Sequence, residues 1–135
     1  MTAWGSIKGD PKSGFAKRLL WDNFVPPNST LIRRSVFETV QGFDANLKGV
    51  DDFDLWYRIA RDFKATICEI PLATWRYNNE SSISFDQSLM IEDESRFYKK
   101  ILALPDATNL EKEVCKERIS MNQVRLANQK LAVGQ

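Results

Sequence analysis

The most constraining feature of the chain is the run of residues 51–63, where two adjacent carboxylates precede a strongly amphipathic helical pattern. At 3.6 residues per turn, the apolar side chains share one broad face and Asp54 falls on the opposite, polar arc. Asp52 breaks this division, because it projects from the apolar face one turn before Trp56. A carboxylate there is either buried at high energetic cost or opens into a cleft, and acid–base chemistry uses the second arrangement.

The composition narrows the chemistry further. The chain of 135 residues contains no histidine, which removes Ser-His and Cys-His nucleophile systems and argues against a zinc site. Proton transfer near neutral pH would then depend on carboxylates, tyrosines or lysines, and attention falls on Asp51 and Asp52. The net charge of +1 gives no electrostatic reason to expect nucleic acid as a partner.

The cysteines and the apolar runs indicate a compartment. Cys68 and Cys115 lie far apart and lack metal-ligand spacing, so we expect free thiols in a reducing environment. No apolar run is long enough to span a membrane, and the N-terminus lacks the layout of a signal peptide. These features predict a cytoplasmic protein, with a peripheral position at the inner face of the membrane as the alternative.

Local patterns predict a mixture of helices and short strands. Ser35 with Glu38, and Thr108 with Glu111, have the spacing of capping boxes, and Gly42 is a natural helix-ending residue. Helices are expected at residues 15–21, 35–42, 52–63, 86–104 and 108–131, and strands at 30–32, 65–70 and 73–77.

The last of these helices carries two thin apolar seams. One consists of Leu110, Val114, Met121, Val124 and Leu131, and the other of Cys115, Ile119, Leu126 and Val133. A single helix–helix contact uses only one seam. We therefore expect the other seam to pack on residues 86–104 or on a second chain, which would give a homodimer.

Four segments, taken together, resemble the C-terminal half of family 2 glycosyltransferases. They are NSTLIRRS at 28–35, VQGFD at 40–44, DDFDLWYR at 51–58, and the later PL…WRYN…SS between 71 and 82. Order and spacing match the family over roughly residues 24–84. Gln41 stands where the family has glycine, Asp51 where it has glutamate, and Asn78 where it often has histidine.

The resemblance implies an α/β fold, namely the C-terminal half of a GT-A (Rossmann-like) domain with short strands. Residues 1–104 would form the acceptor-side half, and residues 105–135 a helical extension. The implied reaction transfers a sugar, with inversion, from a nucleotide-sugar to a hydroxyl of a glycan or lipid-linked acceptor in polysaccharide biosynthesis. The family's nucleotide-binding half and its metal-binding Asp-x-Asp are not in this sequence. We therefore expect a partial catalytic domain that is inactive alone, with Mn²⁺ or Mg²⁺ bound by ligands outside it.

The resemblance also assigns roles to individual residues. The second acid of the pair, Asp52, is implied as the catalytic base, which an inverting displacement needs beside the acceptor oxygen. Substrate-binding roles are implied for Asp51, Asn28, Ser29, Trp75, Arg76 and Asn78. A structural interpretation remains open for several of them: Asn28 and Ser29 suit a turn equally well, and acids at a helix start commonly serve as caps.

Two other classes of function fit the same residues. The chain could be a non-catalytic module that binds another protein through its half-fold and its C-terminal helices. Alternatively, Trp75 and Tyr77 on an extended segment could form a carbohydrate-binding surface. An upstream reading frame that encodes an Asp-x-Asp strand would favour the glycosyltransferase.

Overall fold

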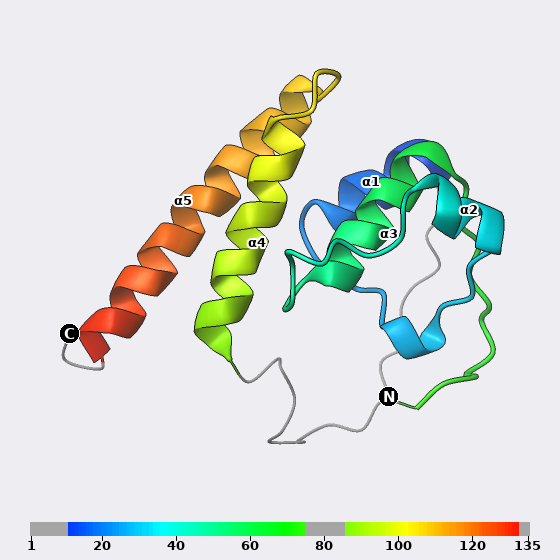
Figure 1. Cartoon of the computed structure of the whole chain (residues 1–135), viewed down its shortest axis with the longest axis horizontal. Helices are drawn as coiled ribbons and strands as arrows, with labels where there is room; N and C mark the ends of the chain where they lie inside the picture. Colours follow the sequence, from blue (N-terminus) through cyan, green and yellow to red (C-terminus); the bar gives the residue numbers. More distant parts are fainter. Residues whose placement is uncertain (1–10, 75–85, 133–135) are drawn as a thin grey trace. The chain divides into compact units, whose positions relative to one another are not determined.

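The computed structural model describes residues 11–74 and 86–132, in which helices are the only regular elements (Figure 1). They are α1 (Pro11–Leu19), the 3₁₀ helix η1 (Pro27–Ser29), α2 (Arg34–Thr39), α3 (Asp51–Asp62), α4 (Gln87–Leu102) and α5 (Asn109–Ala132). The described residues fall into two compact units, one formed by 11–43 with 52–74 and the other by 44–51 with 86–132.

The core of the first unit forms around α3. Phe53, Leu55, Trp56 and Ala60 of the predicted apolar face are buried, and Ile59 and Phe63 of the same face are half-buried. Tyr57, outside the predicted face, is buried as well. The indole Nε1 of Trp56 donates a hydrogen bond to the carbonyl of Val25 at 2.9 Å, so this large ring is also fixed in direction.

The turn after α2 depends on two left-handed residues. Gln41 and Gly42 have φ angles of 63° and 65°, and the Gly42 amide donates to the Phe37 carbonyl at 2.9 Å. A Cβ on Gly42 would lie 2.9 Å from the Phe37 ring, which restricts this position to glycine. The capping box expected at Ser35 is wrong, because α2 begins at Arg34 and its N-cap makes no side-chain hydrogen bond.

The α/β fold expected from the resemblance is contradicted, because the described residues form no strand. Residues 30–32 and 65–70, and the described part of 73–77, run without helix or strand pairing. Their β-branched residues favour an extended backbone, but a strand also needs a neighbouring strand to accept its hydrogen bonds. Three large apolar side chains on these segments are exposed, namely Leu31, Ile67 and Ile70, as is the nearby Leu72, whereas Ile32 is half-buried.

The second unit contains a helical hairpin in which α4 and α5 lie side by side and antiparallel (Figure 1). The capping box at the start of α5 is confirmed: the Thr108 amide donates to Glu111 Oε2 at 2.7 Å, and the Glu111 amide donates to Thr108 Oγ1 at 3.2 Å. The predicted boundary between residues 104 and 105 falls in the short connection between these helices.

The two seams of α5 have different environments. Val114 and Cys115 are buried, and Ile119 and Leu126 are half-buried, so one residue of the first seam and the described part of the second are at least partly covered; Val133 lies outside the described residues. The other members of the first seam are exposed; they are Leu110, Met121, Val124 and Leu131. Among the described helices, none has the length and apolarity needed to cross a bilayer.

Candidate functional site

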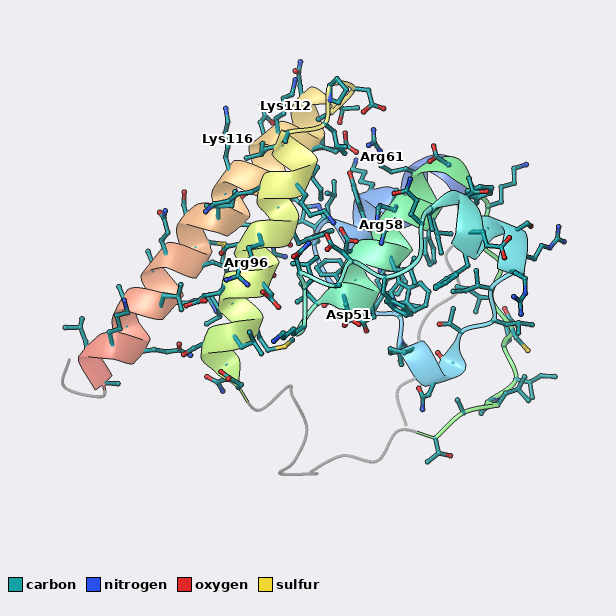
Figure 2. All side chains as sticks on the ribbon, in the orientation of Figure 1. Asp51, Arg58, Arg61, Arg96, Lys112 and Lys116 are labelled. Atoms are coloured by element: carbon teal, nitrogen blue, oxygen red, sulfur yellow. The ribbon has the colours of Figure 1, made fainter. Side chains whose placement is uncertain are left out.

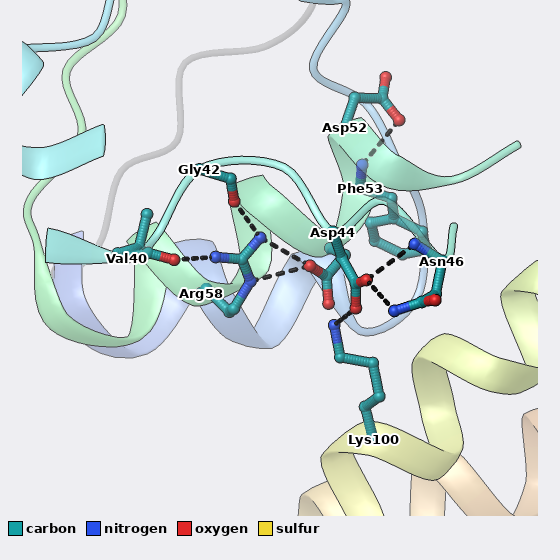
Figure 3. Close-up of polar contacts among 9 residues, drawn as sticks. Val40, Gly42, Asp44, Asn46, Asp52, Phe53, Arg58 and Lys100 are labelled. Atoms are coloured by element: carbon teal, nitrogen blue, oxygen red, sulfur yellow. Dashed lines mark hydrogen bonds and ion pairs between the residues drawn. The ribbon is translucent and has the colours of Figure 1, made fainter. Parts of the chain in front are cut away.

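The carboxylate pair opens α3, with Asp51 as its first residue (Figure 2). Asp52 is half-buried, and its Oδ1 accepts a hydrogen bond from the Phe53 amide at 2.6 Å (Figure 3). The same oxygen also accepts from Asn23 Nδ2 at 3.2 Å. The amide groups of a first helical turn have no partner within the helix, so a carboxylate there is well placed to accept from one. Two N–H donors thus fix the direction of a carboxylate that solvent still reaches.

The neighbouring Asp54 has a different role. Arg58 follows Asp54 by four residues, a spacing that favours an ion pair on a helix, and Arg58 Nη2 lies 2.7 Å from Asp54 Oδ2. Asp54 lies on the polar arc of α3 but is not solvated there, since the residue is only 2% exposed. Arg58 explains the difference: it also donates to the carbonyls of Val40 and Gly42, so the pair closes inward on the turn after α2 (Figure 3).

The candidates on the η1 helix have mainly local contacts. Ser29 Oγ donates to the Pro26 carbonyl at 2.9 Å, as the turn interpretation requires. Asn28 makes a longer-range contact, donating from Nδ2 to the Thr74 carbonyl at 3.0 Å. Asn28 therefore ties η1 to the segment that leads to the remaining candidates; Trp75, Tyr77, Arg76 and Asn78 themselves lie outside the described residues.

A hollow open to solvent lies beside α2. Ile32, Arg34, Phe37 and Glu38 line it, and Asp52 does not. Within residues 11–74 and 86–132, no group of three or more His, Cys, Asp or Glu side chains is arranged to hold a metal ion.

Two polar residues with well-defined contacts were not singled out from the sequence. Asn23 follows α1 in an irregular segment, and no pattern in the sequence indicates its contact with Asp52. Asp93 on α4 did carry a sequence signal, because it is a carboxylate within a helical apolar pattern, as Asp52 is. In the structure Asp93 is completely buried. Its Oδ2 accepts from the backbone amides of Lys48 and Gly49 at 2.7 and 2.9 Å.

The two cysteines are free thiols, as predicted. Cys68 is exposed, whereas burial raises the pKa of the Cys115 thiol to about 12. Since the thiolate is the reactive form, Cys115 is an inert core residue.

Comparison with known proteins identifies no relative: no protein-family model, no curated protein and no solved structure matches the chain. The resemblance to family 2 glycosyltransferases therefore rests on the four sequence segments described above.

Proposed function

We propose that the chain contributes the acceptor-side residues of an inverting sugar transferase that uses a nucleotide-sugar, with Asp52 as the general base. Nucleotide-binding residues and a divalent metal site would be supplied by polypeptide outside these 135 residues. The acceptor hydroxyl would belong to a glycan or a lipid-linked sugar, in the cytoplasm or at the inner face of the membrane.

The environment of Asp52 carries this proposal. A general base must be within reach of the acceptor hydroxyl and held in a defined direction. Asn23 and the Phe53 amide both donate to one oxygen of the half-buried carboxylate, which supports a defined direction for it. Asp54 is unsuited to the role, since it is buried and paired with Arg58.

The test is a transfer assay on the chain prepared together with the polypeptide of an adjacent reading frame that carries an Asp-x-Asp strand. Release of UDP or GDP from nucleotide-sugars would be measured in the presence of Mn²⁺. We expect Asp52→Asn to lower turnover by about 10²–10⁴-fold, the usual contribution of a general base, while donor binding stays unchanged.

Asp62→Asn is the matched control, because Asp62 is exposed at the far end of the same helix. It should leave turnover unchanged. Near-normal turnover in the Asp52→Asn protein would remove the assignment of the base, and no sugar transfer in any preparation would count against the proposed reaction.

A second candidate function is supported by the exposed apolar side chains of the first unit. Leu31, Ile70 and Leu72 are 100%, 67% and 79% exposed. Exposed apolar patches on a protein commonly mark surfaces that bind other proteins. A non-catalytic module that binds another polypeptide through these residues would show such a surface. It would retain that binding in the Asp52→Asn protein and would release no nucleotide.

A further inference from the structure

The loop of residues 44–50 lies along one face of α4, within the second unit. Met90, Asp93 and Lys100 are spaced three and seven residues apart, so they share this face. Lys100 Nζ contacts Asp44 Oδ2 at 2.6 Å at the start of the loop (Figure 3), and Asp93 accepts from the backbone near its end. The loop is therefore attached to α4 at both ends.

Asp93 is the stronger of the two attachments. Its side chain is completely buried, and its Oδ1 accepts from Arg96 Nη1 at 2.5 Å while Oδ2 accepts from the Lys48 and Gly49 amides. Burial alone would raise the pKa of Asp93, but the two backbone amides and Arg96 outweigh it and hold the pKa below its ordinary value. The buried carboxylate thus remains charged and fully engaged.

Close packing reinforces this attachment. A Cβ on Gly49 would lie 2.7 Å from Met90 Sδ and 3.4 Å from Met90 Cα, so the loop backbone lies against α4, and a larger residue at this position would require the Met90 side chain to move. Leu47 and Val50, on either side of these two amides, are 4% and 5% exposed. The backbone is fixed in position up to the residue before Asp51.

We infer that Asp93 is a positioning residue for the Asp51–Asp52 pair, acting through the backbone of Lys48 and Gly49. This inference rests on the proposed function, which gives the pair its chemical role. The chain enters α3 two residues after Gly49, and a shift of that backbone changes the point from which Asp51 and Asp52 project. Small displacements of a catalytic group lower a rate strongly, because the reaction needs near-attack geometry.

The test uses NMR on the chain itself and compares Asp93→Ala with Glu92→Gln. Glu92 is the matched control, because its exposed side chain lies 3.7 Å from Arg96 and, among the described residues, forms no hydrogen bond or ion pair with the loop. In Asp93→Ala, we expect amide exchange at Lys48 and Gly49 to accelerate roughly tenfold or more. Line broadening should extend to the amides of residues 51–53 and leave α5 unchanged, and Glu92→Gln should match the wild type.

A second variant covers the case in which Asp93→Ala does not fold. Gly49→Val leaves Asp93 intact but adds a branched side chain where even a Cβ would lie 2.7 Å from Met90 Sδ, so it should broaden the same amides of residues 51–53. If neither variant disturbs these amides, or if the disturbance spreads evenly over α4 and α5, Asp93 is only a stabilising residue and the inference is wrong.

The sugar-transfer assay separates this inference from the proposed function. In an active preparation, Asp93→Ala should lower kcat without changing the KM for the nucleotide-sugar, and Asp93→Asn, which keeps one acceptor oxygen for the amides, should restore part of it. If no preparation transfers sugar, the proposed function fails, yet the NMR result still decides whether Asp93 fixes the backbone that enters the pair.

Discussion

Arg58 and Asp54 form a partly buried ion pair within one turn of α3, with Nη2 2.7 Å from Oδ2. Arg58 also donates to the carbonyls of Val40 and Gly42, which belong to the left-handed turn after α2. Helical carbonyl groups at a C-terminus have no partner within their own helix. One guanidinium therefore serves both a buried carboxylate and the end of another helix.

Replacing Arg58 should consequently destabilise the first unit. Arg58→Met would leave Asp54 buried without its cation, and we expect a loss of about 3 kcal/mol in the free energy of unfolding, measured by urea denaturation. Lys17→Met, at an exposed site on α1, should change it by less than about 0.5 kcal/mol. Equal stability of the two variants would contradict the role of the pair.

Asp54→Asn should lower the stability of the first unit without lowering the rate of sugar transfer. The substitution removes the charge that Arg58 neutralises, so we expect a lower midpoint of urea denaturation. In an active preparation, turnover per folded molecule should stay close to that of the wild type. A large loss of turnover with normal stability would instead place Asp54 in the reaction.

The pair of Asp44 and Lys100 should make stability depend on acid pH. The hydrogen bond from Lys100, with further bonds from Asn46, lowers the pKa of Asp44 from 3.8 to about 2. A lowered folded-state pKa contributes stability above pH 4 that is lost as the pH falls toward 2, in total about 2 kcal/mol. Thermal denaturation between pH 5 and 2 should show a smaller acid loss in Lys100→Met, while the exposed Lys99→Met behaves as the wild type.

The capping box of α5 should have a measurable effect on the hairpin. Thr108→Ala removes the oxygen that accepts from the Glu111 amide, and we expect a loss of about 1 kcal/mol in the free energy of unfolding. Ser120→Ala is the control, since among the described residues its hydroxyl bonds only to the Lys116 carbonyl within the same helix. If both substitutions have the same effect on the denaturation midpoint, the cap contributes nothing specific.

The exposed seam of α5 should mediate a homodimer. Met121 and Val124 are 48% and 59% exposed, and covering them would remove apolar area from water. Sedimentation equilibrium should detect a dimer of the wild type, and Val124→Lys should shift it toward monomer. A wild-type monomer at high protein concentration would show that this seam stays uncovered.

Periodicity predicted much of the helical structure. The sequence placed α4 and α5 within two residues of their ends, because the capping box and the apolar spacing act within one helix. The pattern at residues 65–70 failed as a strand prediction, since side-chain preference fixes a backbone conformation but not a pairing partner. The burial of Asp54 could not be predicted for a related reason: it depends on Arg58 and on carbonyls 12 to 14 residues earlier.

In the candidate site too, the sequence predicted positions along a helix but not the contacts between residues far apart in the chain. The position of Asp52 at the start of α3 follows from local pattern, whereas its contact with Asn23 joins residues 29 apart. Asp93 and the amides of Lys48 and Gly49 are separated by more than 40 residues. A single sequence contains no signal for such pairs beyond the presence of a carboxylate at an apolar position.

The α4–α5 hairpin is held less firmly beyond the buried Asn122 than at the end that carries the Thr108 cap. The Oδ1 of Asn122 accepts from Arg125, but its Nδ2 has no hydrogen-bond partner among the described residues. Beyond Asn122, the described polar links from α5 to α4 are exposed contacts such as Gln129 to Ser88, which contribute little in water. Local unfolding of the hairpin should therefore start at Ala132 and extend along α5 toward the Thr108 cap. Amide exchange should be fastest at the far end of α5 and slowest around Cys115.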